Sequence, residues 1–205
     1  MIFRRAFPVF AVALFCLMSV SHLRPVCEKL LHPLEQVDPQ IFQGGLAFVA
    51  GSLNHQPSLD ALKQRDSITV YFSNSTDASR TTYTQINRFG DQCQHLPYNI
   101  TMEGTTFNFD VANRFQLEAS FRYTSCPDCV VMQWLVHSEK RRSLELYLLS
   151  RRRQVEEKEM EEFLDQLWCY NLPPPVVMDP TKELCPKEPQ NTTTLAQGLA
   201  EKQDQ

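Results

Sequence analysis

Alternation of apolar and polar residues with a period of two is the dominant pattern along the chain. The clearest run lies at residues 115–123, where Phe, Leu, Ala, Phe and Tyr interleave with Gln, Glu, Ser and Arg. Successive side chains of a strand point to opposite faces, so this run predicts a strand with one buried face. Residues 68–72 and 107–111 alternate in the same way, and residues 144–148 do so more loosely.

Four further segments complete the predicted set of strands. They are the apolar stretch 46–53, the Thr-rich stretch 80–89, the segment 93–102 and the apolar run 130–136. About eight short strands at regular spacing, with no long helix between them, are typical of an all-β barrel or sandwich.

One clear helical pattern follows the strands. Met160, Phe163, Leu164 and Leu167 are spaced i, i+3, i+4 and i+7, which makes one apolar stripe. Acidic residues fill the remaining faces and indicate a solvated surface. We therefore expect a helix that docks its stripe on the outside of the β layer and ends near Asn171.

The first residues have the pattern of a secretory signal peptide. Arg4 and Arg5 precede an apolar run, and Ser19 and Ser21 form a small-x-small site. The run has about fifteen residues, fewer than the ~20 that a membrane-spanning helix needs. We predict cleavage near Ser21, with residues 1–21 as the signal peptide and a secreted, extracellular product that has no integral membrane segment.

The remaining residues predict one domain, at 22–186, because chains usually divide only beyond roughly 250 residues. The formal net charge is −4, and removal of Arg4 and Arg5 makes the product more acidic. A net negative charge argues against binding to nucleic acid, because the phosphates of nucleic acid attract basic surfaces. From residue 187 onward large apolar side chains are almost absent, so we predict a disordered polar tail at 187–205.

The extracellular compartment determines how the cysteines are interpreted. Of the seven cysteines, Cys16 lies in the signal segment, and the even number that remains indicates three disulfides. Three N-x-S/T sequons fit the same compartment and predict surface glycosylation at Asn74, Asn99 and Asn191.

The pair Cys126 and Cys129 has a C-x-x-C spacing that suits a redox site, half a zinc site or a structural bridge. A catalytic pair normally starts a helix, whereas a predicted strand follows here. Zinc needs two more Cys or His nearby, and the five histidines are scattered. We predict a structural bridge, with no metal, no cofactor and no enzymatic activity, because no catalytic signature has a usable context.

Two longer stretches resemble the lipocalins. FQGGLAFVAGS at 42–52 resembles the G-x-W segment of the first lipocalin strand, and LYLLSRRRQVEEKEMEEF at 146–163 resembles the last strand, its arginine and the following helix. With SCPDCVVM and VVMDPTKELCP, the chain is similar to the apolipoprotein M branch from about Cys27 to Pro186, and most similar to the fish plasma glycoproteins that bind saxitoxin and tetrodotoxin. The resemblance implies a monomeric, eight-stranded antiparallel up-and-down barrel with one C-terminal helix outside.

Two positions depart from the family pattern. Leu46 replaces the tryptophan of the barrel floor, on which the arginine corresponding to Arg151 usually stacks, so we expect a less tightly packed floor. Arg151 could instead cap carbonyl groups of the first strand. In apolipoprotein M basic residues at the barrel mouth hold a sphingolipid phosphate; Arg114 matches one of them, but Leu96 occupies the place of another. One arginine supplies half of the donors that a phosphate needs.

The resemblance also implies the disulfide pairing. The first two bridges would fasten the N-terminal arm and the C-terminal segment to the rest of the domain, and the third would fix a tight turn. The pairs are Cys27 with Cys169, Cys93 with Cys185, and Cys126 with Cys129.

A lipocalin barrel implies a binding protein. We predict a plasma carrier for a small hydrophobic or amphipathic ligand, of the lipid, sphingolipid or retinoid type, whose partners could include lipoprotein particles. The predicted lining residues are Phe107, Phe109, Phe115, Leu117, Phe121 and Leu146. The predicted orienting residues are Tyr98, Arg114, Tyr123 and Trp134.

Two alternatives stay open. A carrier of guanidinium toxins would need acidic or aromatic groups at the barrel mouth, for which Glu103 and Glu118 are candidates. An acute-phase regulatory glycoprotein would act through its outer surface and keep a residual or collapsed pocket.

Overall fold

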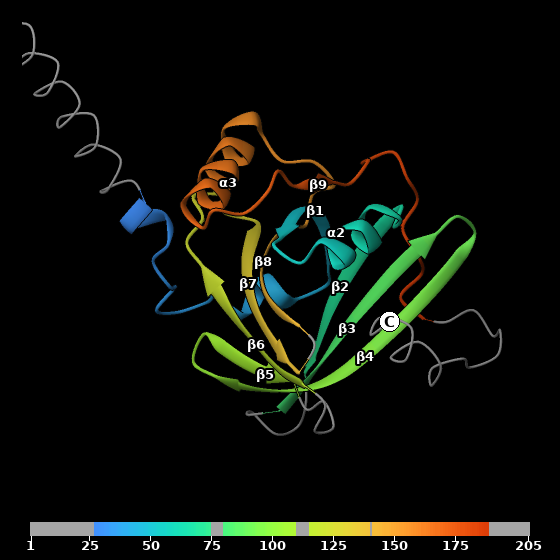
Figure 1. Cartoon of the computed structure of the whole chain (residues 1–205). Coiled ribbons are helices and arrows are strands. Elements are labelled where there is room, and N and C mark those ends of the chain that lie inside the picture. The colour runs from blue at the N-terminus through green and yellow to red at the C-terminus, as the bar shows by residue number, and fades with distance from the viewer. Residues whose placement is uncertain (1–26, 75–79, 110–114, 140, 189–205) are drawn as a thin grey trace, which may run out of the picture.

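Eight antiparallel strands form a closed barrel in the computed structural model, which describes residues 27–74, 80–109, 115–139 and 141–188 (Figure 1). Each strand pairs with the next in sequence, and β1 pairs with both β2 and β8, which closes the barrel. The predicted fold class is therefore confirmed. The strands are β1 Gly45–Leu53, β2 Ser67–Asn74, β3 Arg80–Phe89, β4 Gln92–Glu103, β5 Thr106–Phe109, β6 Phe115–Arg122, β7 Cys129–Ser138 and β8 Arg142–Ser150.

One face of each strand points into the barrel, and these side chains form the cluster that we call the barrel core. The predicted alternation holds in β2, where Ile68 and Val70 point inward, and in β5, where Phe107 and Phe109 do so. Burial of such side chains is the main stabilising contribution to the fold. Other members of the barrel core are Leu46, Phe48, Tyr83, Ile100, Ala119, Phe121, Val130, Met132, Trp134 and Leu149.

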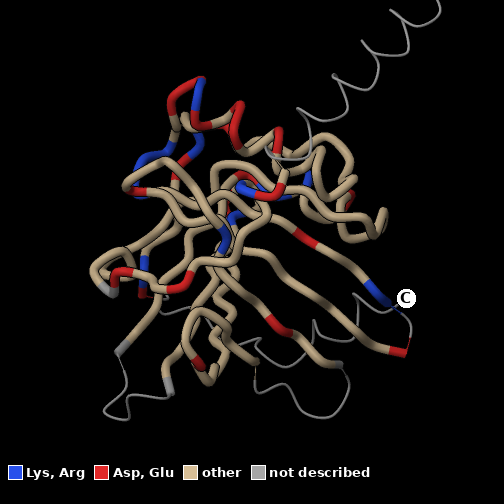
Figure 2. Tube along the Cα trace, turned by 90° about the vertical axis from the view of Figure 1, so that its left-hand side faces the viewer, with Lys and Arg blue, Asp and Glu red and all other residues tan. Residues whose placement is uncertain are grey.

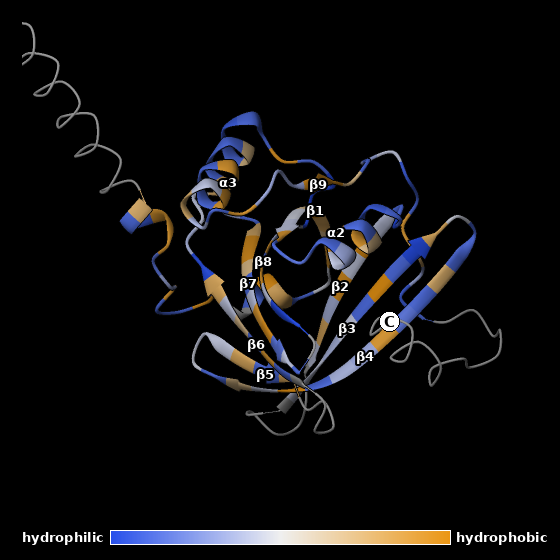
Figure 3. Ribbon diagram, in the orientation of Figure 1, coloured by the Kyte–Doolittle hydropathy of each residue, from blue (hydrophilic) through white to orange (hydrophobic). Residues whose placement is uncertain are grey.

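Helix α3 (Glu157–Cys169) packs on the outside of the barrel, as predicted. Phe163 and Leu167 pack against outward-facing residues of the strands in the cluster that we call the outer core, whereas Leu164 is exposed. Figure 3 shows hydrophobic positions along β7 and β8, near α3. The remaining members of the outer core are Val49, Ala50, Cys126, Cys129, Val131, Leu146, Leu148 and Val155.

Asn171 ends α3, as the sequence predicts. Its φ is 53°, the left-handed conformation that helix C-termini commonly adopt at this position. The N–H of Leu172 donates to the carbonyl of Leu167 at 2.9 Å, and the N–H of Asn171 donates to that of Trp168 at 3.0 Å. These bonds satisfy carbonyl groups that the end of the helix would otherwise leave free.

Two short helices that flank β1 were not predicted, nor was the helical turn at residues 27–30. The 3-10 helix η1 (Pro39–Phe42) precedes β1, and helix α2 (Gln56–Lys63) connects β1 to β2. Since β1 runs from η1 to α2, the two helices lie at opposite ends of that strand. Leu59 and Leu62 of α2 are buried in the barrel core, so α2 covers one end of the barrel.

The C-terminal segment, residues 176–186, returns from α3 across the barrel. The short strand β9 (Val176–Val177), also not predicted, pairs with β1, and Met178 reaches the barrel core. Arg88 forms a 2.9 Å salt bridge with Glu183 of this segment. The segment is thus attached both to β1 and to the β3–β4 side of the barrel.

Three disulfides join the six cysteines in the pairing that the resemblance implies: Cys27–Cys169, Cys93–Cys185 and Cys126–Cys129. The first fastens the N-terminal arm to the end of α3, and the second fastens the C-terminal segment to β4. The third closes the turn that precedes β7.

Two of the predictions concern the ends of the chain. The predicted signal peptide at 1–21 and residues 189–205 of the predicted tail lie outside the described residues. Among the helices of the described ranges, none is long and apolar enough to cross a membrane.

The outer core can be tested with two substitutions on one helix. Phe163 is 1% exposed and Leu164 is 42% exposed. Phe163→Ala should lower the free energy of unfolding by about 3–5 kcal/mol, because it leaves a cavity between α3 and the barrel. The control, Leu164→Ala, should change it by less than about 0.5 kcal/mol. Urea unfolding with intact disulfides measures both values, and equal losses would contradict the packing described here.

Candidate functional site

Aromatic rings fill most of the barrel interior. The Trp134 ring lies 5.0 Å from that of Phe109 and 5.5 Å from that of Tyr83, measured between centroids. Phe107 lies 5.4 Å from Phe121. These separations are typical of favourable tilted and edge-to-face aromatic pairs. The interior is therefore an apolar chamber with specific packing.

Phe42 fills the floor of the barrel. Its ring lies 4.6 Å from Phe72 and 5.2 Å from Phe121, and Leu46 beside it is 1% exposed. Arg151 donates to the carbonyl of Gln40 in η1, not to the first strand. A half-buried aromatic ring from the segment before β1 thus packs at this end of the barrel, and the less tightly packed floor stays a prediction.

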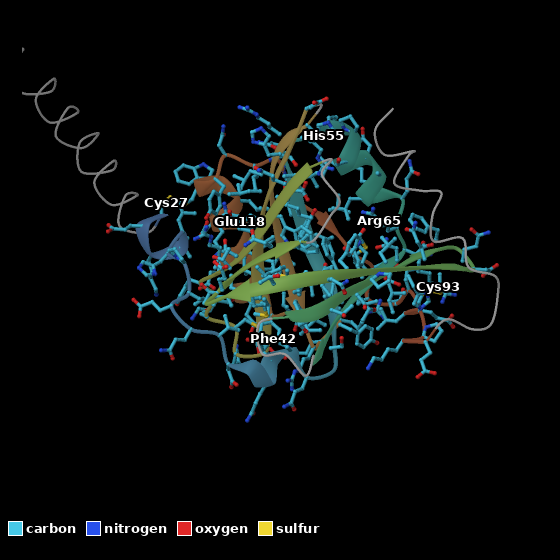
Figure 4. The ribbon with its side chains drawn as sticks, turned by 90° about the horizontal axis from the view of Figure 1, so that it is seen from below. Cys27, Phe42, His55, Arg65, Cys93 and Glu118 are labelled. Atoms are coloured by element: carbon cyan, nitrogen blue, oxygen red, sulfur yellow. A yellow bond between two sulfur atoms is a disulfide. The ribbon has the colours of Figure 1, made fainter. Side chains whose placement is uncertain are left out.

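A cavity of about 30 Å³ remains in the barrel beneath α2. Leu62, Arg65, Tyr83 and Tyr147 are among its lining residues, together with Phe48, Ile68, Val70, Gln85, Met132 and Leu149. Figure 4 shows Arg65 on the α2 side of the barrel and Phe42 on the η1 side. The cavity thus combines apolar and polar side chains in its wall, and one of the polar side chains is cationic.

Arg65 is a cation within this largely apolar chamber. Burial lowers the pKa of its guanidinium, and the nearby Tyr147 and Glu145 oppose that shift. Its Nε is buried and has no hydrogen-bond partner. A second buried donor without a partner, the Nε1 of Trp134, belongs to the same barrel core.

A buried carboxylate, Glu145, also faces the interior. Arg141 forms a salt bridge with it, the Ser143 hydroxyl donates to it at 2.7 Å, and the Tyr147 hydroxyl donates to its other oxygen. Burial raises the pKa of Tyr147 well above its ordinary value, and Glu145 raises it further. The negative charge of Glu145 is therefore already compensated by Arg141.

A chain of polar side chains continues along β3. The hydroxyl of Tyr83 donates to Gln85 at 3.2 Å, Gln85 donates to Asn87 at 2.8 Å, and Asn87 donates to Gln94 at 3.1 Å. Burial raises the pKa of Tyr83, so its phenol stays protonated at neutral pH. These bonds orient the Tyr83 hydroxyl at the cavity.

Most of the predicted lining residues lie in the barrel core. Phe107, Phe109 and Phe121 are buried there, and Leu117 packs against them. Phe115 begins β6, but its side chain lies outside the described part of the structure.

Leu146 does not line the barrel, which corrects its prediction. It belongs to the outer core, whereas Tyr147 and Leu149 point inward. The outer face of β8 is apolar because α3 covers it, whereas the inner face carries Glu145 and Tyr147, so the alternation of its leucines led to the wrong face.

The predicted orienting residues are divided between the inside and the outside. Tyr98 and Trp134 point inward, with the Tyr98 ring 5.6 Å from Phe109. Tyr123 does not, because β6 ends at Arg122; its ring lies beneath the ammonium group of Lys29, 4.9 Å from ring centroid to Nζ, in an open surface groove. Arg114 lies outside the described residues.

The candidate acidic groups for a cationic ligand, Glu103 and Glu118, are exposed. Asn99 is exposed on β4, where a glycan would have room, while Asn191 and the side chain of Asn74 lie outside the described part of the chain.

Sequence reasoning missed Arg65, Gln85, Glu145 and Tyr147 as site residues. For Glu145 and Tyr147 a signal was present, since they occupy the alternate positions of β8.

Comparison with solved structures shows that the fold is the lipocalin fold. Lipocalin 12 from rat epididymis is 17% identical, with a TM-score of 0.64 over 75% of this chain and 91% of that one. The siderocalin Ex-FABP, described as functioning through dual ligand specificities, is 15% identical, with a TM-score of 0.60 over 75% of this chain and 99% of that one. No protein-family model and no curated protein matches the sequence.

Tyr83 and Tyr147, whose phenols lie inside the barrel, should make the folded protein less stable at alkaline pH. Their folded pKa values are raised above the ordinary value of about 10, so their contribution is fully present below pH 10 and is lost as the pH rises. At pH 11 the fully buried Tyr83 should cost about 1.4 kcal/mol, and the half-buried Tyr147 at most that much. Urea unfolding at pH 9 and 11 measures the loss.

The Tyr83→Phe variant is the control for this measurement. It should lose less stability between pH 9 and 11 than the wild-type protein, by about 1.4 kcal/mol, because one ionisation of the unfolded chain is removed. Complete formation of tyrosinate absorbance near pH 10 in the folded wild type would contradict the burial of these phenols.

Proposed function

We propose that the chain is a lipocalin that binds a small hydrophobic or amphipathic molecule inside its barrel and acts as a carrier. The observation that supports this most directly is the chamber beneath α2, which has aromatic walls and two buried donors without partners. Ligand pockets typically combine a mostly apolar lining with a few placed polar groups. Catalysis would need a nucleophile or an acid–base pair in position to react. The polar groups inside the barrel instead form stable hydrogen bonds with one another or are donors without a partner.

The size of the cavity limits how such a ligand binds. A volume of about 30 Å³ holds little more than a water molecule, so an amphiphile must displace side chains. Helix α2 is the element whose movement would open the chamber, because it has only eight residues and contributes Leu59 and Leu62 to the barrel core. We infer that ligand binding is coupled to repacking beneath α2.

The setting that we propose is extracellular. Support comes from the signal-like N-terminal sequence, the three disulfides and the exposed sequon at Asn99. The assignment to the apolipoprotein M branch, and within it to the fish toxin-binding glycoproteins, rests on the sequence motifs. Monomeric state, plasma location and contact with lipoprotein particles are part of the same proposal.

A carrier of guanidinium toxins has less support. Glu103 and Glu118 are exposed, and the interior carboxylate, Glu145, is paired with Arg141. A cationic ligand would also meet the charge of Arg65 in the chamber.

A surface-acting glycoprotein is the second candidate, and the small cavity favours it. In that case the aromatic chamber would be a packed core, and partners would bind outside. Figure 2 shows acidic positions gathered along α3 at the top of the molecule, which gives this outer face a negative character.

The two tryptophans allow a direct test, because one lies inside the barrel and one outside. Trp134 is 7% exposed in the barrel core, and Trp168 is 62% exposed on α3. In the Trp168→Phe variant the remaining indole reports on the chamber, and in Trp134→Phe it reports on the surface. The probes are 11-bromoundecan-1-ol and 11-bromoundecanoate, because bromine quenches indole fluorescence at contact distance.

A barrel carrier should show saturable quenching of the Trp168→Phe variant by at least one probe, and little quenching of Trp134→Phe. Quenching confined to the Trp134→Phe variant would place the amphiphile on the surface. Absence of quenching in both variants would refute the carrier proposal and favour the surface-acting glycoprotein.

A further inference from the structure

Arg65 is a partly buried cation, and no carboxylate among the described residues neutralises its charge at close range. It forms no salt bridge within the described residues, and its Nε has no acceptor. An arginine keeps its charge at neutral pH, and a charge taken out of water is costly unless it is paired. The buried Nε of Arg65 therefore lacks an acceptor inside the chamber.

The chamber holds a second unfilled donor close to the same two tyrosines. Tyr83 and Tyr147 line the cavity with Arg65, and the ring of Trp134 lies 5.5 Å from Tyr83 and 5.7 Å from Tyr147. The Nε1 of Trp134 is buried without a partner. Two side chains that neighbour the same pair of tyrosines thus each carry a buried N–H group without an acceptor.

The acceptors that the protein supplies nearby are already occupied. Glu145 receives Arg141, Ser143 and the Tyr147 hydroxyl, and the Gln85 carbonyl oxygen receives the Tyr83 hydroxyl. Each phenol therefore already donates its proton to one of these two side chains. Arg65 and Trp134 would need an acceptor that comes from elsewhere.

We infer that the ligand of the barrel carries a carboxylate, which Arg65 binds, with its hydrocarbon part lying among the aromatic rings of the barrel core. This inference rests on the proposed function and names its ligand class. The planar fork of a guanidinium, with Nε as one of its donors, matches the two oxygens of a carboxylate. The carboxylate also completes the ion pair that the chain leaves open.

A carboxylate fits the site better than a phosphate monoester or a neutral head group. A phosphate carries nearly two negative charges, and the other interior cation, Arg141, is already paired with Glu145. A hydroxyl would leave the charge of Arg65 without compensation. A monoanion balances a single guanidinium.

The place of Arg65 in the chain indicates how the ligand is oriented. Arg65 lies between α2 and β2, and Leu62 of α2 lines the same cavity. Phe42, Phe72 and Phe121 occupy the opposite, η1 end of the barrel. The carboxylate would thus lie beneath α2, and the apolar tail would extend toward the floor.

The test compares three probes that share one tail, at pH 7.5: 11-bromoundecanoate, 11-bromoundecan-1-ol and 11-bromoundecyl phosphate. Quenching of Trp134 in the Trp168→Phe background gives the dissociation constants. The carboxylate should bind at least about tenfold more tightly than the alcohol, as expected for charge-assisted hydrogen bonds in a buried site. The phosphate should bind more weakly than the carboxylate.

Substitutions in the same background assign this preference to Arg65. Arg65→Gln should remove the preference for the carboxylate and change binding of the alcohol by less than about threefold. Arg65→Lys should retain part of the preference, because it keeps the charge without the fork. Lys63→Gln is the matched control: it removes an exposed positive charge on α2, 54% exposed, and should leave the preference intact.

Each outcome separates this inference from the proposed function. Equal binding of carboxylate and alcohol would overturn the inference and leave the barrel carrier intact, and tighter binding of the phosphate would overturn the choice of carboxylate. A preference that survives in Arg65→Gln would overturn the role of Arg65. If none of the probes quenches Trp134, the proposed function itself fails. Should Arg65→Gln fail to fold, Arg65→Lys and Lys63→Gln still decide the role of the guanidinium.

Discussion

The double pairing of β1 is the constraint on which the rest of the structure depends. β1 pairs with β2 through Gly45–Ala47 and with β8 through Ala47–Leu53, with a register shift between Phe48 and Ala50. This irregularity lets one strand turn from one neighbour to the other, as β-bulges do. As a result, Phe48 lies in the barrel core, whereas Val49 and Ala50 lie in the outer core. Gly51 has no room for a side chain, since a Cβ would lie 2.4 Å from Phe48 and 2.6 Å from Tyr147.

The strands could be predicted well from the sequence because most of them have one solvent-exposed face. β6 shows this clearly, with exposed Gln116 and Glu118 between residues that point inward. In β8 the apolar face is the outer one, because α3 covers Leu146 and Leu148 while Glu145 and Tyr147 point inward, and the alternation there led to the wrong face. Helix α2 was missed because eight residues hold too few turns for a clear period, although Leu59 and Leu62 already had helical spacing.

The candidate site was harder to predict than the fold. The phenylalanines of the lining follow from strand alternation, whereas Trp134 lies in a continuous apolar run that shows no preferred face. Arg65 lies between Gln64 and Asp66, a polar stretch typical of an exposed loop, and no local pattern shows that the side chain turns into the barrel. Phe42 likewise belongs to a short segment before the first strand. Both are positioned by barrel closure, which brings together residues that are distant in sequence.

The three disulfides differ greatly in the length of chain that each encloses, and this difference bears on the order of oxidative folding. Cys126 and Cys129 are 3 residues apart and can meet as soon as their turn forms. Cys93 and Cys185 are 92 apart, and Cys27 and Cys169 are 142 apart, so each pair meets after the strands between them have assembled. During synthesis Cys27 is exposed together with three nearer thiols before its own partner exists. Any bridge between Cys27 and one of those nearer thiols would have to be exchanged before the Cys27–Cys169 bridge can form.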